Sequence, residues 1–269
     1  MSMPEIGPNH PIAYREEIAA PLFRKLLSGE SCTIIGAASM GKSRLLQFLL
    51  RNDVQTHYLG DAANAMLLLW VDSNRMAEFT AWGLHELMLT ALVESCGKHP
   101  SAISLREKLT AWREQVILQE NGLLAQRYVE LALQMLCDEM GLRLCFVLDE
   151  FDEPYRNLPP QALASLRALR DRHKYVLTYL LFLRDDPAAL RDPNECEGFY
   201  ELLSRAIIGL KPYTGSDAQR VIAQIATRRE QELPSFTAPV TNELLRLSGG
   251  HPGLLVALLD ALTHELPLG

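Results

Sequence analysis

The sequence predicts an α/β protein in which helices cover a parallel β-sheet. Short apolar runs alternate along the chain with longer amphipathic segments, and this alternation is typical of parallel strands buried beneath helices. With 269 residues, of which 48 % are hydrophobic, the chain can bury a large core without a disulfide or a structural metal. It contains no low-complexity segment and no repeat at a period of roughly 20 to 50 residues. We therefore expect one sizeable α/β core.

Five apolar runs are expected to form the strands of the sheet. They are residues 32–36, 66–71, 144–148, 176–183 and 206–210. Each run is bounded by charged residues, glycine or proline, as buried strands commonly are. Cys32 and Cys145 lie inside two of the runs, and none of the five cysteines has C-x-x-C spacing. We expect reduced, buried cysteines and therefore a cytoplasmic protein.

Amphipathic segments between these runs predict the covering helices, because their apolar residues recur at helical spacing. The expected helices are residues 18–27, 42–50, 78–96, 122–140, 160–172 and 199–203. The connection between the second and third strands is unusually long, and residues 101–120 within it predict a further helix.

The strand signal stops after residue 210, and the rest of the chain predicts only helices. The segment 216–229 is amphipathic, with Ser216 or Asp217 as its N-cap. The segments 239–247 and 252–264 each begin with a proline, which is tolerated in the first turn of a helix. We therefore expect a core domain over residues 1–210 and a helical lid domain over residues 211–269.

Charge and hydropathy exclude two classes of protein. The net charge is −7 at pH 7, whereas tight non-specific binding to nucleic acid needs a basic surface. The longest apolar runs are too short to cross a bilayer. The N-terminal segment lacks the cationic start and apolar core of a secretory signal. Membrane proteins and broadly basic nucleic-acid-binding proteins are therefore not expected.

The strongest motif is a phosphate-binding loop between the first expected strand and the helix after it. Gly36-Ala37-Ala38-Ser39-Met40-Gly41-Lys42-Ser43 matches G-x-x-x-x-G-K-S in full, and Arg44 opens the helical run that follows. A match at these four fixed positions arises by chance in roughly one chain in a hundred of this length. The strand and helix that flank the motif make a chance turn the weaker interpretation.

The residue types of this loop are those that phosphate binding requires. Glycines let the backbone fold around phosphates so that successive N–H groups point inward, and the helix adds its positive N-terminal end. The ammonium of Lys42 reaches the β- and γ-phosphates, and the hydroxyl of Ser43 is a ligand for Mg²⁺. The nine residues from Gly36 to Arg44 are therefore the expected ATP-binding residues.

A second motif ends the third expected strand with two carboxylates. Asp149 is expected to hold Mg²⁺, and Glu150 to polarise the attacking water as general base. The alternative is that residues 149–153 form a solvated acidic turn. A glutamate beside the aspartate favours hydrolysis, because nucleotide binding alone needs no base.

In this order the two motifs resemble the AAA+/STAND branch of P-loop ATPases, in which STAND members are signal-transduction ATPases. Tyr14-Arg15-Glu16-Glu17 is similar to the family's G-R-x-x-E segment, with Tyr14 in place of the glycine. The resemblance implies the strand order 5-1-4-3-2. It also implies that Arg15 lies near the adenine.

Three further positions gain a role only from this resemblance. Arg184 ends the fourth strand where the family places a sensor for the γ-phosphate; the alternative is an arginine that caps a strand end. Gly250-His251-Pro252 resembles the G-x-P motif of the lid, whose proline packs against adenine; the alternative is an ordinary helix connection. Arg205 lies where AAA+ proteins carry an arginine finger, and a helix-terminal charge explains it equally well.

The resemblance implies a switch that binds ATP and Mg²⁺, hydrolyses ATP slowly, and forms a homo-oligomer in the ATP state with an unidentified protein effector. STAND proteins normally continue into a winged-helix domain, whereas this sequence ends at Gly269. An isolated ATPase module, a truncated chain and a subunit with its effector on another polypeptide all remain open. The alternative function is a DNA-associated AAA+ ATPase, because residues 210–214 resemble the strand exit of origin-recognition ATPases. A small-molecule kinase ranks last.

Overall fold

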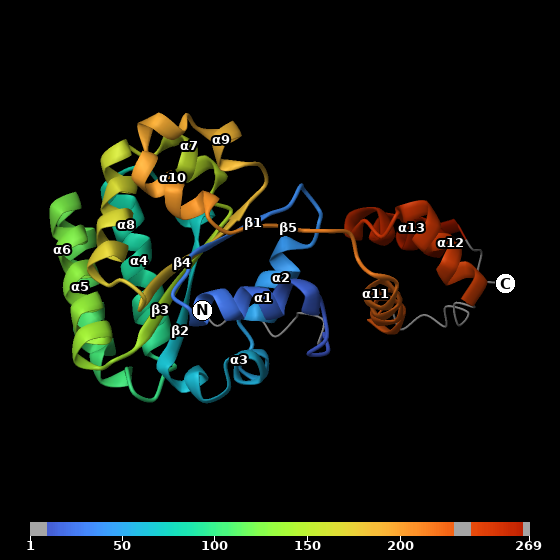
Figure 1. Ribbon diagram of the computed structural model, residues 1–269, viewed down its shortest axis with the longest axis horizontal. Coiled ribbons are helices and arrows are strands. Elements are labelled where there is room, and N and C mark those ends of the chain that lie inside the picture. The colour runs from blue at the N-terminus through green and yellow to red at the C-terminus, as the bar shows by residue number, and fades with distance from the viewer. Residues whose placement is uncertain (1–9, 229–237, 266–269) are drawn as a thin grey trace. The chain divides into compact units, whose positions relative to one another are not determined.

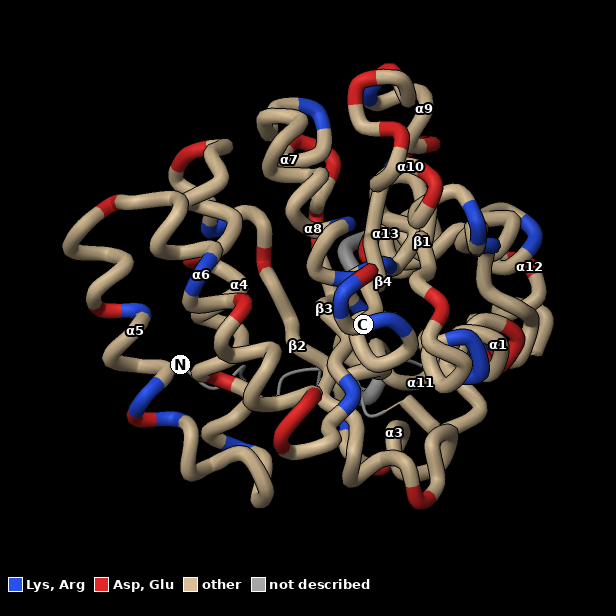
Figure 2. Tube along the Cα trace, turned by 60° about the vertical axis from the view of Figure 1, so that its left-hand side comes forward, with Lys and Arg blue, Asp and Glu red and all other residues tan. Residues whose placement is uncertain are grey.

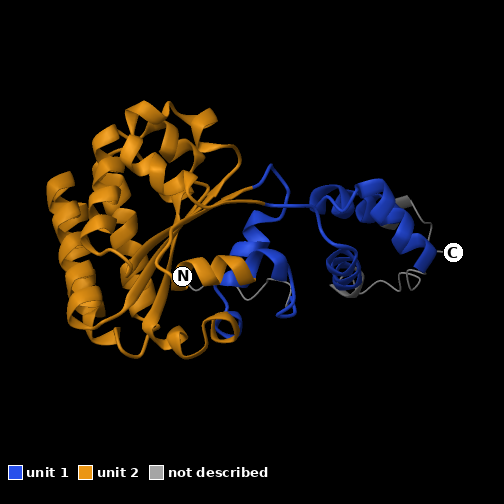
Figure 3. Cartoon of the chain, in the orientation of Figure 1, with its two compact units in different colours: residues 1–19, 36–54, 210–269 blue, residues 20–35, 55–209 orange. Residues whose placement is uncertain are grey.

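The computed structural model describes residues 10–228 and 238–265, which form two compact units (Figure 3). The larger unit comprises residues 20–35 and 55–209. The smaller unit comprises residues 1–19, 36–54 and 210–269. The expected division into domains 1–210 and 211–269 stays a prediction.

The larger unit contains the predicted five-stranded parallel sheet. Its strands are β1 (Cys32–Ile35), β2 (Met66–Asp72), β3 (Arg143–Asp149), β4 (Leu177–Leu183) and β5 (Ile207–Gly209). They are ordered β2-β3-β4-β1-β5, which is the expected 5-1-4-3-2 counted from the other edge. All five runs predicted from the sequence form strands. For β1 to β4 the reason is burial on both faces, which suits continuous apolar runs, whereas β5 at the edge of the sheet is largely exposed.

The register brings the carboxyl ends of four strands to one edge of the sheet. Ile35 lies opposite Leu183 across β1 and β4, and Asp72 lies opposite Asp149 across β2 and β3. Because every pairing is parallel, the segments that follow these strands all leave the sheet at this edge. Open α/β sheets bind their ligands at this edge.

Helices cover both faces of the sheet (Figure 1). On one side α4 (Ala81–Cys96) packs on β2 and α8 (Pro160–Arg172) on β4, with α5 (Arg106–Gln119) and α6 (Gly122–Leu133) against α4. The opposite side carries α1 (Glu16–Leu27). The remaining helices of this unit are α7 (Asp152–Asn157), α9 (Pro187–Leu190) and α10 (Glu197–Ser204).

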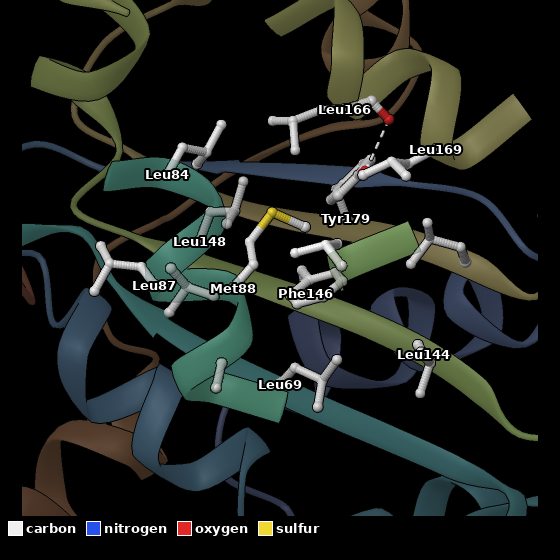
Figure 4. Close-up of a cluster of buried hydrophobic side chains, with 14 of the residues drawn as sticks. Leu69, Leu84, Leu87, Met88, Leu144, Phe146, Leu148, Leu166, Leu169 and Tyr179 are labelled. Carbon is white, nitrogen blue, oxygen red and sulfur yellow. Dashed lines mark hydrogen bonds between the residues drawn. The ribbon is translucent and has the colours of Figure 1, made fainter. Parts of the chain in front are cut away.

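The core of the larger unit lies between the sheet and these helices (Figure 4). Leu69, Phe146 and Leu148 of the strands face Leu84 and Met88 of α4, and all five are buried. On the adjoining strand, the hydroxyl of Tyr179 donates to the carbonyl of Leu166 in α8 at 2.8 Å, which satisfies the polar tip of a buried aromatic residue.

The five cysteines are free and buried, in agreement with the sequence analysis. Burial raises the pKa of the Cys32 and Cys145 thiols to about 12, so both behave as small core residues. Among the helices of residues 10–228 and 238–265, none is long and apolar enough to span a membrane.

The smaller unit is helical in its described parts. It contains α2 (Lys42–Leu49), the start of α3 (Asn52–Leu59), α11 (Gly215–Arg228), α12 (Ala238–Ser248) and α13 (Pro252–Glu265). The last three helices pack on one another, and Val221, Leu244 and Leu255 are among their buried residues. Strands are absent from the described residues after 210, as predicted.

Several local predictions need correction. The expected N-cap of α11 is wrong: the helix begins at Gly215, and Thr214 accepts a hydrogen bond from the Asp217 amide at 3.3 Å. The helix predicted over 122–140 is α-helical only to Leu133, after which Gln134–Glu139 is a π-helix. The helix predicted over 101–120 begins at Arg106, after the 3-10 turn Ile103–Leu105. Further 3-10 turns cover Gly60–Ala65, Ser73–Arg75 and Pro193–Glu195.

Two glycines with positive φ allow a stability prediction. Gly29 has φ +75°, and a Cβ there would lie 2.6 Å from the Cα of Tyr175; Gly141 has φ +68°, with nothing within 4 Å of a Cβ. Gly141→Ala should cost about 1 kcal/mol, from the left-handed backbone alone. Gly29→Ala should cost about 2 to 4 kcal/mol, because a backbone clash is added. Urea unfolding measures both, and equal midpoints for the two variants would contradict the clash.

Candidate nucleotide-binding site

The predicted phosphate-binding loop lies between the last residue of β1 and the first residue of α2. Its backbone is left-handed at Ser39, with φ 61°, and at Gly41, with φ 87°. Single left-handed residues in a tight loop let neighbouring N–H groups converge on an anion. The left-handed backbone at Gly41 favours glycine, and a Cβ there would also lie only 3.3 Å from the hydroxyl of Tyr213.

Lys42 is held inside its own loop. The side chain is buried, and its ammonium donates to the carbonyls of Gly36 at 2.6 Å and Ala37 at 3.4 Å. Phosphate oxygens are stronger acceptors for an ammonium than neutral carbonyls. Lys42 can therefore exchange these carbonyls for a phosphate. Ser43 is exposed and Arg44 half-buried in the first turn of α2, where an anion is also favoured.

The turn before α13 contacts this loop within the smaller unit. Gly249 and Gly250 have φ 57° and 75°, and the Gly253 amide donates to the Ser39 carbonyl at 3.1 Å. A Cβ at Gly41 would lie 3.8 Å from the Cγ of Pro252. The structure therefore places the G-x-P turn next to the phosphate-binding loop. The predicted contact of Pro252 with adenine stays a prediction.

The side chain of Arg15 also contacts the phosphate-binding loop, at a backbone carbonyl of the loop. The side chain is fully buried, and its Nη2 donates to the carbonyl of Met40 at 3.0 Å while Nη1 donates to Lys211 at 2.8 Å. The predicted proximity of Arg15 to adenine stays a prediction. In the structure its two Nη atoms are engaged by protein carbonyls.

The larger unit carries the acidic motif at the carboxyl end of β3. Asp149 is buried and lies opposite Asp72 of β2. Burial, and to a lesser extent the neighbouring carboxylates of Glu150 and Asp72, raise the pKa of Asp149 to about 6. Among the described residues, no group of three or more His, Cys, Asp and Glu side chains is arranged to hold a metal ion. The carboxylate of Asp149 is a ligand type that Mg²⁺ prefers, and its role as a Mg²⁺ ligand stays a prediction.

Glu150 and Arg184, the expected base and sensor, form an ion pair. Arg184 donates to Oε2 of Glu150 from Nη2 at 2.6 Å and from Nε at 3.2 Å. The Glu150 carboxylate raises the pKa of the Arg184 guanidinium. Glu150 has φ 48°, an uncommon backbone conformation for a residue with a side chain. The structure brings these two residues together and leaves their chemical roles as predictions.

A pocket of about 260 Å³ lies beside this ion pair in the larger unit. Glu150, Arg184 and Asp152 line it, together with Ser73 and Phe79. Its volume is below the usual range of about 300 to 1,000 Å³ for sites that hold a whole small ligand. It has room for water next to the Glu150 carboxylate, which a general base needs.

Arg205 follows the last residue of α10 and is exposed. A cation at this end of a helix is favoured by the helix dipole. This position agrees with both interpretations of Arg205, so the arginine finger stays a prediction.

Sequence reasoning missed four polar residues of these sites. Asp72 crowds Asp149, and Asp152 accepts from the Arg184 amide at 2.8 Å. Tyr213 and Asp217 contact Arg15. A signal existed for Asp72, which follows an apolar run as Asp149 does. The other three depend on contacts distant in sequence.

Comparison with known proteins gives structural neighbours only. No protein-family model matches the chain, and no curated protein sequence matches it. Aeropyrum pernix ORC2, in ADPNP–ADP complexes, is 16 % identical with a TM-score of 0.57 over 84 % of this chain and 54 % of that one. Aeropyrum pernix ORC1, in complex with DNA, is 15 % identical with a TM-score of 0.55 over 96 % and 62 %. A Walker-type ATPase of Pyrococcus abyssi is 16 % identical with a TM-score of 0.57 over 93 % and 68 %.

The chain has the P-loop NTPase fold. Its neighbours are Cdc6/ORC proteins and a Walker-type ATPase, which share this fold at 14 to 16 % identity. The chain spans only 54 to 62 % of the length of the first Cdc6p and ORC chains that it matches. Membership of the STAND branch stays a prediction.

The contact between the G-x-P turn and the phosphate-binding loop predicts an intolerance at Gly253. A Cβ there would lie 2.5 Å from the Cβ of Ser39, so Gly253→Ala should displace the turn and break the hydrogen bond to Ser39. Amide exchange of residues 250–254 should accelerate by about tenfold, which corresponds to roughly 1.4 kcal/mol of local stability. Gly215→Ala is the matched control, because nothing lies within 4 Å of its Cβ. Unchanged exchange in Gly253→Ala would show that the contact is absent in solution.

Proposed function

We propose that this chain is a Mg²⁺-dependent ATPase that acts as a conformational switch for a protein partner. The observation that carries the proposal is the phosphate-binding loop, whose left-handed Ser39 and Gly41 and buried Lys42 form an anion cradle next to the G-x-P turn. The nucleotide complexes of ORC2 and the ATPase of Pyrococcus abyssi support the choice of ATP, since both share the fold.

The chain's own residues divide the work of hydrolysis. The loop amides and Lys42 bind the phosphates, and Pro252 packs against the adenine. Ser43 and Asp149 would hold Mg²⁺, which would supply positive charge to offset that of the phosphates. Glu150 accepts a proton from the attacking water, and Arg184 stabilises the charge on the γ-phosphate.

The ion pair between Glu150 and Arg184 supports slow turnover. Both donors of Arg184 engage Oε2 of the residue proposed as general base. For Arg184 to act on the γ-phosphate it must exchange this carboxylate for phosphate oxygens. Hydrolysis therefore needs a rearrangement before the chemical step, as suits a switch better than a fast enzyme.

The output would be a change in the lid and in assembly. The amide of Gly253 is bonded to the loop that would hold the phosphates, so a nucleotide there acts directly on the lid turn. We propose a homo-oligomer in the ATP state, in which the exposed Arg205 reaches the site of a neighbouring subunit, with a protein effector as the partner.

Lys42→Ala should abolish or greatly weaken ATP binding. The substitution removes a buried ammonium from the phosphate cradle and leaves the backbone amides alone to offset the phosphate charge. Titration calorimetry with ATP and Mg²⁺ measures the affinity. Lys25→Ala is the control, because Lys25 is half-buried outside the phosphate-binding loop and paired with Glu30. Wild-type affinity in Lys42→Ala would end the proposal.

Glu150→Gln should leave ATP binding intact and slow hydrolysis by about 10²- to 10⁴-fold, the usual contribution of a general base. The amide keeps the shape of the side chain but cannot accept the proton of water. Steady-state phosphate release measures the rate. Glu153→Gln is the control, since Glu153 is exposed and paired with Arg156 near the same strand end. A wild-type rate in Glu150→Gln would place the base elsewhere.

The second candidate is an ATPase that assembles on DNA, and the fold shared with ORC1 in complex with DNA favours it. Against it stand the net charge of −7 and a group of acidic residues before and after α9 and within α10 (Figure 2), namely Asp185, Asp186, Asp192, Glu195, Glu197 and Glu201. Retention on duplex DNA across a salt series, with ATP and with ADP, separates the two. ATP-dependent retention that weakens steeply with salt would favour the DNA role, and no retention would favour the protein switch.

A further inference from the structure

The fully buried Arg15 joins three segments of the smaller unit that are far apart in sequence. From the N-terminal segment, its guanidinium donates to Met40 in the phosphate-binding loop at 3.0 Å and to Lys211 at 2.8 Å. The guanidinium carbon also lies 4.6 Å from the centre of the Tyr213 ring. Residues 211–213 lead into α11, so this one side chain contacts both the loop and the entrance to the lid.

The surroundings of Arg15 make these contacts obligatory. A buried cation is costly unless hydrogen bonds and charge offset the loss of water. Among the described residues, carbonyl oxygens and the Tyr213 face supply this compensation, and no carboxylate forms an ion pair with the guanidinium. A carbonyl that moved away would leave a buried N–H group of a charged side chain unpaired, which is unfavourable.

Neighbouring contacts fix the same junction. The amide of Arg15 donates to the buried Asp217 in the first turn of α11 at 3.4 Å. The hydroxyl of Tyr14 is 3.2 Å from that of Tyr213. In turn, the Tyr213 amide donates to the carbonyl of Gly250 at 2.8 Å, in the turn that contacts the loop through Gly253. The lid turn is thus held to the phosphate-binding loop directly and also through Tyr213 and Arg15.

We propose that Arg15 is a positioning residue that couples the lid to the phosphate-binding loop, and that it does so without touching the nucleotide. Movement of the loop at Met40 changes one of its two carbonyl partners, and movement of residues 211–213 changes the other. The proposal deepens the proposed function and rests on it for the effect of nucleotide. The tie itself is a property of the protein without nucleotide.

Arginine is required because the two acceptors belong to different segments. Its planar fork presents two Nη groups at fixed separation, whereas the ammonium of lysine is a single flexible point charge. The side chain has no exposed surface, so a base could reach it only after these bonds break. This burial supports a role for Arg15 in holding protein segments together and not in contacting the nucleotide.

The test compares Arg15→Lys with wild type, first without nucleotide. Amide exchange at residues 39–41 and 250–254 should accelerate by about tenfold or more in the variant, because one of two carbonyls loses its donor. Arg24→Lys is the matched control, since Arg24 is an exposed arginine of α1. Wild-type exchange in Arg15→Lys would overturn the tie.

The second stage adds nucleotide. Arg15→Lys should still bind ATP, while the difference in lid exchange between the ADP and ATP states should fall. Methylguanidinium should restore that difference in Arg15→Ala, and methylammonium should not. A residue with only a structural role would give weaker binding with the difference intact, and that result overturns the coupling.

The outcomes separate this proposal from the proposed function. If wild-type protein binds no ATP, the proposed function fails, and the nucleotide-free exchange still decides the tie. Should the Arg15 variants fail to fold by circular dichroism, Tyr213→Leu replaces them, because it removes the ring beneath the guanidinium and leaves both carbonyls. Accelerated exchange at residues 250–254 in Tyr213→Leu supports the tie, and wild-type exchange overturns it.

Discussion

Parallel pairing of the strands is the constraint on which the rest of the structure depends. Every strand pairing in this sheet is parallel, so all five strands point the same way. Parallel neighbours must be joined by crossover connections, which here include the helices that cover the sheet. Three residues with a proposed binding or catalytic role come immediately after strands: Gly36 after β1, Glu150 after β3 and Arg184 after β4. One hydrogen-bonding pattern therefore accounts for both the buried core and the common edge at which these segments begin.

In each unit, a charged residue with a proposed catalytic or binding role already has a protein partner. Lys42 is bonded to carbonyls of its own loop, and Glu150 is bonded to Arg184. A ligand that takes such a group gains only the difference between the new bond and the old one. This lowers affinity, but it also means that ligand binding must rearrange the protein. Such an exchange suits a conformational switch, because the protein group released by the ligand is free to adopt another position.

The sequence was informative where local physics decides. Strands buried on both faces must be continuous apolar runs, and α8 and α13 begin at prolines, so these elements were predictable. The phosphate-binding loop is a contiguous motif.

Short helices such as α7 and the π-helical end of α6 carry no comparable pattern. At the start of α11 the sequence predicts Ser216 or Asp217 as the cap, and only the hydrogen bond from the Asp217 amide to the hydroxyl of Thr214 shows that Thr214 serves. The partners of Arg15 lie 25 and 196 residues away, beyond the reach of any local pattern.

Tyr14, which stands where the G-R-x-x-E pattern has glycine, is accounted for by the packing around Arg15. Its ring stacks on His10 at 3.8 Å and meets the edge of Phe48 at 5.3 Å, so a glycine would leave this space unfilled. Burial raises the pKa of the Tyr14 hydroxyl, which keeps it neutral and able to share a hydrogen bond with Tyr213. Tyr213 thus shares a hydrogen bond with the hydroxyl of Tyr14, and its ring packs against the guanidinium of Arg15. A glycine at position 14 would supply neither the ring nor the hydroxyl, and Arg15 alone would then hold the N-terminal segment to Tyr213. Tyr14 and Arg15 therefore hold the N-terminal segment to Tyr213 together, Tyr14 through its ring and hydroxyl and Arg15 through its charged guanidinium.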